Sequence, residues 1–271
     1  MINYIGIRKT NFKESTQNKP LILFLHIPKT GGSSLTSILK KQYRDNEIIE
    51  LNPHSLEEDN KLIAQEGIDA LGNFGFKKMN PEDIEKLRQF AVKEESKAVF
   101  GHFPFGIHDY IDRATQYFTT LRNPQNLVLS LYHEMFKSDD NFDVALVKKF
   151  QSLEDFASYI GNVQTFILSG FSKYKQLLDN PEQAFAKAIE NINKHFIHIG
   201  TLEAFDKSIK ITGKKLHWKN KYKTEHLRKG DYNRNQITTD TYKLLSENNR
   251  LDEELYDYVL RKFKRKFFGQ I

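Results

Sequence analysis

Residues that can bind an anion are concentrated between His26 and Ser34, in the segment His-Ile-Pro-Lys-Thr-Gly-Gly-Ser-Ser. Gly31 and Gly32 permit a tight turn and let the backbone approach a ligand closely. The N–H groups of this turn and of a following helix would point toward one place, where the helix dipole also favours a negative charge. The side chains that add positive charge or hydroxyl donors are Lys29, Thr30, Ser33 and Ser34. The segment therefore predicts a site for phosphate, or for phosphate that carries sulfate.

The order of these residues bears on which phosphate compound binds. In the loop that binds nucleoside triphosphates, G-x-x-x-x-G-K-[ST], the lysine follows the glycines and a hydroxyl residue helps to hold Mg²⁺. Here Lys29 precedes Gly31 and Gly32, and no Asp stands convincingly at the end of a strand. A P-loop-like, ATP-dependent kinase is therefore the alternative interpretation and not the first.

A second anion site is predicted near Arg122, which follows the apolar segment 117–121. The next residues, Asn123 and Pro124, are typical of a helix start, because Asn caps a helix and Pro fits its first turn. Ser130 comes about two helical turns later, so we expect it on the same side of that helix as Asn123. An arginine fork and a serine hydroxyl that converge on one point suit a terminal phosphate.

His102 is the candidate proton acceptor. It follows Gly101 at the end of a predicted strand, and ligands of open α/β sheets bind at such carboxyl ends. Histidine titrates near neutral pH, so it can take a proton from an attacking hydroxyl. Among the 9 histidines of the chain, His108 is close in sequence and is the main rival, whereas we expect His26 to be a buried structural residue.

The pattern of apolar residues places these candidates on alternating strands and helices. Strands are predicted at 21–27, 98–103, 117–121 and 196–200. Helices are predicted at 33–39, 81–93, 153–160 and 181–194, after Pro124, and from 249 onward, where apolar residues recur every four positions. This alternation is typical of an α/β fold with a mostly parallel sheet flanked by helices. We expect one P-loop-like domain over 20–271, with an N-terminal arm at 1–19 and a helical insertion or acceptor lid at 44–95.

The segment that runs from His26 to Ser34 resembles the 5′-phosphosulfate loop of sulfotransferase family 2, which includes the Golgi carbohydrate sulfotransferases. The resemblance implies that 3′-phosphoadenosine 5′-phosphosulfate (PAPS) is the sulfuryl donor and that the transfer requires no metal. It also implies an acceptor hydroxyl, which we expect on a glycan or glycoconjugate. Lys29 would then act in catalysis by stabilising the leaving 5′-phosphate, and we expect no nucleic-acid partner.

Two further segments resemble the same family. The segment that begins at Arg122 is similar to the family's 3′-phosphate segment, Arg-Asp-Pro-x-x-Arg-x-x-Ser-x-Tyr, which implies that Arg122 and Ser130 hold the 3′-phosphate. The chain departs from this pattern at Asn123, in place of Asp, and at Leu127, in place of the second Arg. The Gly-His-x-x-Phe segment around His102 is similar to the one that carries the family's catalytic histidine.

A basic segment near the C-terminus narrows the resemblance. The sequence His226-Leu227-Arg228-Lys229 is similar to the Ser-His-Leu-Arg-Lys-Thr segment of hexuronic acid 2-O-sulfotransferases, which helps to close over the donor nucleotide. The resemblance assigns this donor-binding role to Arg228 and Lys229. Gly230 stands where the final Thr of that segment is expected.

The composition of the 271-residue chain limits the remaining alternatives. It contains no Cys, which excludes thiolate catalysis, disulfides and Cys-ligated metals. An excess of 41 Lys and Arg over 35 Asp and Glu suits an anionic ligand, and it keeps open a non-enzymatic, basic polyanion-binding protein. No apolar segment is long enough to span a membrane, and the N-terminus does not resemble a signal peptide. We therefore expect a cytoplasmic protein without a transmembrane segment.

Overall fold

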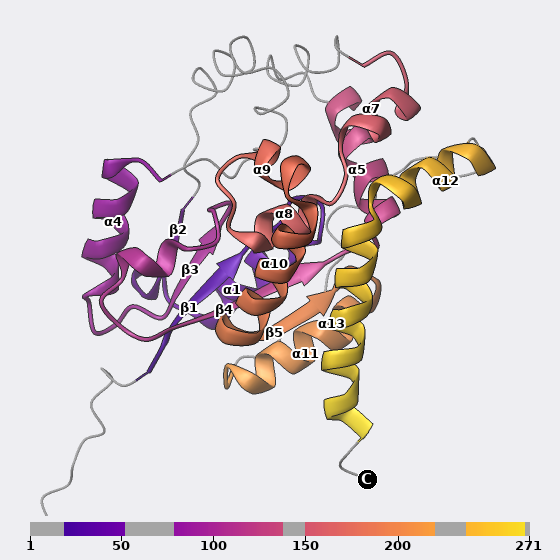
Figure 1. The fold of residues 1–271 in the computed structure, drawn as a ribbon. Helices are drawn as coiled ribbons and strands as arrows, with labels where there is room; N and C mark the ends of the chain where they lie inside the picture. The colour runs from indigo at the N-terminus through magenta and orange to yellow at the C-terminus, as the bar shows by residue number, and fades with distance from the viewer. Residues whose placement is uncertain (1–18, 52–78, 138–149, 220–236, 269–271) are drawn as a thin grey trace, which may run out of the picture.

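The computed structural model describes residues 19–51, 79–137, 150–219 and 237–268. Five strands form one sheet in the order β2-β3-β1-β4-β5, and all neighbouring strands are parallel (Figure 1). The strands are β1 (Leu21–Leu25), β2 (Ile48–Glu50), β3 (Ala98–Gly101), β4 (Thr115–Leu121) and β5 (Phe196–Thr201). The prediction of an α/β fold with a parallel sheet is confirmed.

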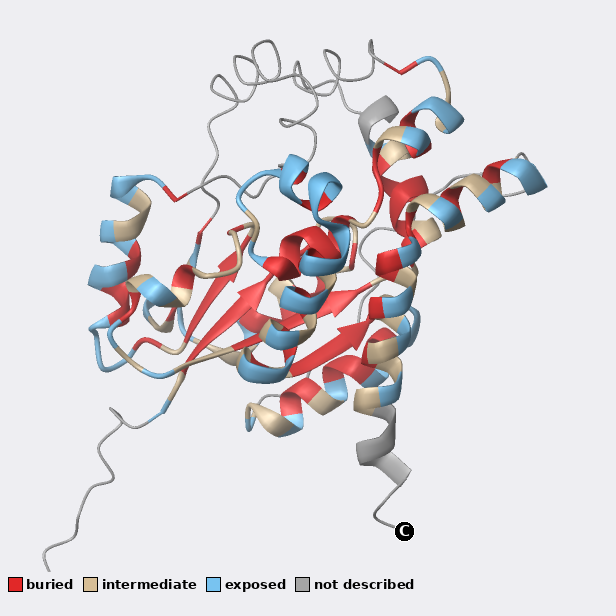
Figure 2. Ribbon diagram, viewed as in Figure 1, coloured by how far each residue is buried: buried red, intermediate tan, exposed pale blue. Residues whose placement is uncertain are grey.

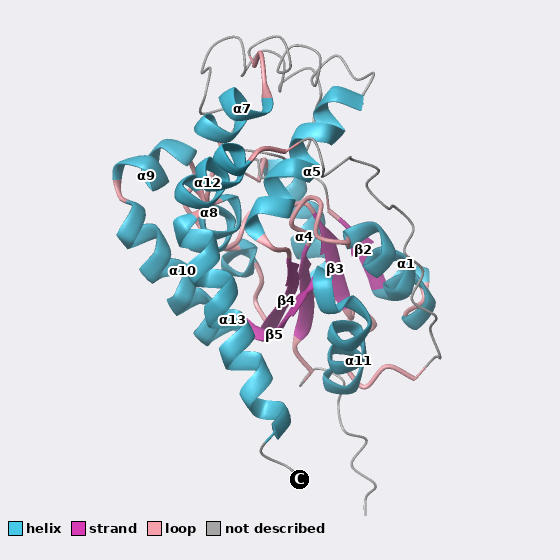
Figure 3. Cartoon of the chain, turned by 90° about the vertical axis from the view of Figure 1, so that its right-hand side faces the viewer, coloured by secondary structure: helices cyan, strands magenta, loops and turns pink. Residues whose placement is uncertain are grey.

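Helices cover both faces of this sheet. They are α1 (Gly32–Gln42), α4 (Pro81–Ala91), α5 (Pro124–Lys137), α7 (Leu153–Tyr159), α8 (Val163–Ser169), α9 (Tyr174–Asp179), α10 (Pro181–His195), α11 (Phe205–Lys215), α12 (Thr239–Asn248) and α13 (Arg250–Phe268). Short 3₁₀ turns are η2 (Asp45–Glu47), η3 (Ile107–Tyr110) and η4 (Leu202–Ala204). Figure 3 shows the sheet between one layer that contains α10 and α13 and another that contains α1 and α11.

The central strand β1 explains the two layers. All of its residues are apolar and buried, as Figure 2 shows for most of the sheet. Alternate side chains of a strand point to opposite faces. Accordingly Leu21, Leu23 and Leu25 belong to the core under α10 and α13, whereas Ile22 and Phe24 belong to the core under α1 and α11. A strand buried on both faces is therefore apolar throughout its length.

The predicted elements have observed counterparts, but the strand β2 and the helices α8, α9 and α12 were not predicted. The edge strand β2 lies inside the stretch 44–95, which the sequence indicated as an insertion or lid. Its residue Ile48 is buried, and so are Leu87 and Phe90 of α4 farther along the same stretch. The described parts of this stretch thus contribute to the sheet and its core. Residues 52–78 and the arm at 1–18 lie outside the described residues.

The strand order determines where a ligand can bind. From β1 the chain goes to the β2–β3 side of the sheet and then crosses to β4 on the other side. The strand order thus reverses at β1, and open α/β sheets bind their ligands beyond the carboxyl ends of the strands at such a point. The segments that follow β1, β3 and β4 therefore meet at one edge, and they contain Lys29, His102 and Arg122.

Candidate active site

The loop between β1 and α1 has the conformation that an anion-binding turn requires. Lys29 and Gly31 both adopt left-handed backbone angles, with φ of 63° and 90°. Gly31 is the N-cap of α1, no side chain caps this helix, and its first turn contains no acidic residue. The positive end of the α1 dipole is thus not neutralised by a carboxylate of its own first turn.

The two glycines of the loop are required by the space around them. A Cβ at Gly32 would lie 1.6 Å from Nε2 of His26, and a Cβ at Gly31 would lie 2.8 Å from Cδ1 of Leu202. No side chain fits at Gly32 while the His26 ring stays in place. The need for glycine is therefore steric at Gly32, whereas at Gly31 the left-handed φ adds a conformational reason.

The hydroxyl residues of the loop differ in their surroundings. Thr30 is buried, and its Oγ1 donates to the carbonyl of Ile27 at 2.7 Å. Its hydroxyl proton therefore stabilises the turn. Ser33 is exposed, whereas Ser34 is buried in the first turn of α1.

Arg122 connects the two predicted anion sites. Its Nη1 donates to the backbone carbonyl of Lys29 at 3.0 Å, so the guanidinium lies directly against the loop. Its partner along the sequence, Ser130, is buried on α5. As predicted, Asn123 caps α5, since its Oδ1 accepts the N–H of Asn126 at 3.1 Å. The structure thus brings the segments after β1 and β4 together at one point.

Lys29 also forms an ion pair with Glu134, which no sequence pattern indicates. Its Nζ lies 2.8 Å from Oε2 of Glu134, which is on α5 one helical turn beyond Ser130. Residues four apart on a helix share a face, so Glu134 and Ser130 both face the loop side of α5.

His102 lies with the loop, and His108 does not. The rings of His102 and His26 stack with centroids 4.0 Å apart, and His26 in turn lies against Gly32. His108 instead contacts the hydroxyl of Tyr117 at 2.9 Å through Nδ1, near the amino end of β4. Since the loop lies at the carboxyl end of the sheet, only His102 of these two rivals follows a strand into the site.

His26 has a larger part in the site than the sequence indicated. It was expected to be a buried structural residue within a strand, but it lies just after β1 and fills the space between Gly32 and His102. Burial, together with the smaller effects of His102 and Lys29, lowers the pKa of His26 to about 3. The His26 ring is therefore neutral at physiological pH.

A hydrogen-bonded chain supports Arg122 from behind. The side chain of buried Gln164 accepts the Arg122 N–H at 2.9 Å and donates to the Arg122 carbonyl at 3.0 Å. The backbone N–H groups of Gln164 and Thr165 donate to the carboxylate of Asp252 at 3.0 and 2.6 Å. Asp252 is wholly buried on α13. Because α8 and α13 are far apart in sequence, no local pattern could have indicated this support.

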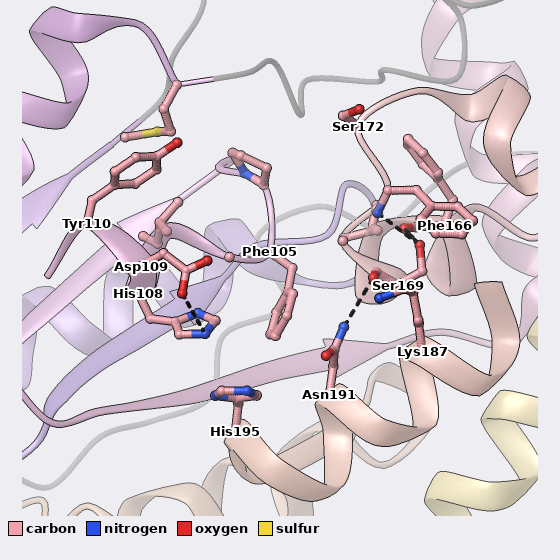
Figure 4. Close-up of a pocket in the computed structure, with 17 residues that line it drawn as sticks. Phe105, His108, Asp109, Tyr110, Phe166, Ser169, Ser172, Lys187, Asn191 and His195 are labelled. Carbon is pink, nitrogen blue, oxygen red and sulfur yellow. Dashed lines mark hydrogen bonds and ion pairs between the residues drawn. The ribbon is translucent and has the colours of Figure 1, made fainter. Parts of the chain in front are cut away.

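A cavity of about 500 Å³ lies beside the segment that follows His102. Figure 4 shows Phe105 between residues of η3 on one side and residues of α8 and α10 on the other. The lining combines aromatic rings with polar groups: Phe105, Tyr110, Phe166, Phe171, His108, Asp109, Ser172, Lys187, Asn191 and His195. The rings of His108 and His195 are 4.3 Å apart.

Some predicted features fall outside these observations. Arg228 and Lys229 lie outside the described residues. Within the described ranges, no three His, Asp or Glu side chains are grouped so as to hold a metal ion. No helix in the part of the chain that the structure describes has the length and apolar character needed to cross a membrane.

Comparison with known proteins agrees with this geometry. The model of the sulfotransferase family matches residues 15–259, which contain the loop, His102, Arg122 and Ser130. No curated protein matches the chain significantly. Since the family model spans most of the sequence, the chain belongs to sulfotransferase family 2.

Proposed function

We propose that this sulfotransferase uses PAPS as its donor and transfers the sulfuryl group to a hydroxyl of a carbohydrate. The observation that carries the proposal is the 3.0 Å contact between the Arg122 guanidinium and the Lys29 carbonyl. It brings two cationic side chains, from the segments after β1 and β4, to one edge of the sheet. An adenosine that carries phosphate groups at its 3′ and 5′ positions suits such a pair of sites.

The transfer has a simple balance of bonds. The acceptor oxygen forms a bond to sulfur while the bond from sulfur to the bridging oxygen of the 5′-phosphate breaks. The electron pair of that bond stays on the phosphate, which leaves as 3′-phosphoadenosine 5′-phosphate (PAP). His102 takes the proton of the acceptor hydroxyl. Lys29 and the N–H groups at the start of α1 stabilise the charge that develops on the leaving phosphate.

The remaining residues hold the donor. Arg122 and Ser130 bind the 3′-phosphate, and the Gln164 amide fixes the backbone of Arg122 from both sides. The family resemblance assigns donor binding also to Arg228 and Lys229, which would add two positive charges. No step requires a metal ion, because the loop and its lysine supply the positive charge.

The cavity lined by the segment 104–110 supports a carbohydrate acceptor. Its volume lies within the range of small-molecule pockets. Aromatic faces suit the C–H surfaces of a sugar ring, while Asn191, Lys187 and Ser172 offer groups for its hydroxyls. Pro104, two residues after His102 in the chain, is part of the lining, so the lining begins on the segment that follows the proposed base.

Calorimetric titration tests the donor assignment. We expect PAP to bind at least about tenfold more tightly than 5′-AMP, because only PAP engages Arg122 and Ser130 as well as the loop. ATP should bind weakly, and Mg²⁺ should not change the affinity for PAP. Equal affinities for PAP and 5′-AMP would overturn the donor assignment. Mg²⁺-dependent turnover of ATP would overturn it in favour of a kinase.

Replacement of His102 tests the base. His102→Ala should lower the rate of transfer by about 10² to 10⁴, which is the usual contribution of a general base, and should leave PAP affinity nearly unchanged. His108→Ala is the matched comparison: it should raise the KM for acceptor and leave kcat within about threefold. The opposite pattern would assign the proton transfer to His108.

A further inference from the structure

Glu134 places a negative charge where the proposed function requires a multiply charged anion to bind. Its Oε2 is 2.8 Å from Nζ of Lys29, the lysine of the phosphate loop. A carboxylate next to a phosphate disfavours binding, because like charges at short distance repel. A carboxylate at this position would weaken donor binding unless it has a role that it performs through Lys29.

The positions of Lys29 and Glu134 are determined by the loop after β1 and by helix α5. Glu134 is on α5 one turn after Ser130, on the face that Ser130 turns to the site. The backbone of Lys29 is held at a φ of 63°, and its carbonyl accepts from Arg122. Both partners are thus presented from positions that neighbouring elements determine.

The ion pair is also weak enough to be exchanged. The side chain of Glu134 is 49% exposed and that of Lys29 is 21% exposed, so water screens their attraction. Partly exposed pairs of this kind contribute little to stability. A phosphosulfate group, with more charge and more acceptor oxygens than one carboxylate, competes successfully for the lysine.

We propose that Glu134 is a positioning residue, which holds the Lys29 side chain beside the loop and releases it when the donor binds. This inference rests on the proposed function. Its consequence is that donor affinity is reduced by the free energy needed to break the Lys29–Glu134 contact. The lysine is thereby kept extended across the site and is neutralised until an anion of sufficient charge replaces the carboxylate.

Titration of Glu134→Gln with PAP tests the inference. The variant should bind PAP roughly three- to fivefold more tightly than the wild type, because Lys29 no longer has to leave a charged partner. Glu254→Gln is the matched control, since Glu254 is also 49% exposed and pairs with Arg250 at 2.7 Å. That control should leave PAP affinity unchanged.

A double-mutant cycle separates the role through Lys29 from simple repulsion. In a Lys29→Met background, Glu134→Gln should change PAP affinity by less than about twofold, because the partner that it restrains is gone. If the gain persists in that background, Glu134 acts by direct repulsion and the positioning role is wrong.

The remaining outcomes are distinct from a failure of the proposed function. If the wild type does not bind PAP at all, the donor assignment fails. If the wild type binds PAP and Glu134→Gln binds it equally, only the positioning role fails. If Glu134→Gln retains PAP binding and loses transfer by more than about a hundredfold, Glu134 is the proton acceptor, which also overturns the inference.

Discussion

At the scale of single residues, the site is built from side chains packed tightly around backbone. The His26 ring lies against Gly32 on one side and stacks on the His102 ring on the other, so it leaves no space for a side chain at position 32. The neutral His26 ring separates the first turn of α1 from the His102 ring. His102 is therefore held in place by an aromatic neighbour that does not compete with it for a proton at physiological pH.

Substitution of Gly32 tests this packing. In Gly32→Ala the new Cβ would meet the His26 ring at 1.6 Å, so the ring or the start of α1 must move. We expect a loss of about 1–3 kcal/mol in the free energy of unfolding and at least a tenfold loss in PAP affinity. Urea denaturation and calorimetry measure the two effects. Ser37→Ala, farther along α1, should change neither by a comparable amount, and unchanged PAP affinity in Gly32→Ala would show that the stack does not shape the loop.

At the scale of elements, two helices distant in sequence hold the segment after β4. Helix α8 begins at the carboxylate of Asp252 on α13, and Gln164 of α8 clamps the backbone of Arg122. The Arg122 side chain then supports the Lys29 carbonyl. The geometry of the phosphate loop thus depends on a helix near the C-terminus.

Removal of the Asp252 carboxylate tests this dependence. Asp252→Ala leaves two buried N–H groups without their acceptor, so we expect a loss of about 2–4 kcal/mol in the free energy of unfolding. At temperatures where the variant is folded, PAP affinity should fall as well. Ser152→Ala, which removes the partly exposed N-cap of α7, should cost only about 1 kcal/mol and leave PAP binding intact. Equal losses of stability in the two variants would contradict the proposed importance of the buried carboxylate.

At the scale of the whole molecule, the core contains a histidine that opposes folding in acid. His198 on β5 is 2% exposed, and its ring meets that of Phe263 on α13 edge to face. Neither ring nitrogen has a hydrogen-bond partner among the described residues. Burial lowers the pKa of His198 to about 4, and the charge of Lys215 acts in the same direction.

The sign of the pH effect follows from this lowered pKa. The folded state favours neutral His198, so its contribution to stability is complete above the unfolded pKa of about 6.5 and declines as the pH falls toward 4. Between pH 7.5 and pH 5 we expect the wild type to lose about 2 kcal/mol more than His198→Leu, which cannot take up the proton. Urea denaturation of both proteins at the two pH values measures this difference. Parallel pH dependence of the two proteins would show that His198 is not protonated on unfolding.

The sequence by itself determined which segments follow the buried strands and were therefore proposed to carry the chemistry. The turn at Lys29, His102 and Arg122 each follow a buried strand, and such strand ends are read from residues next to one another in the chain. Once an alternating pattern indicates a parallel sheet, the carboxyl ends of its strands must lie along one edge. The sequence alone therefore predicts that the segments around Lys29, His102 and Arg122 meet at one edge of the sheet.

Only the tertiary structure decided how the side chains at that edge are paired. Local pattern does not specify that β1 lies between β3 and β4, that Glu134 reaches Lys29, or that Asp252 supports Arg122 through Gln164. The short strand β2 was also missed, because three residues are too few to show a period and its stability comes from pairing with β3. The physical reason is common to all of these contacts. Neighbours in sequence determine local conformation, whereas the partners of a side chain depend on how distant helices and strands pack together.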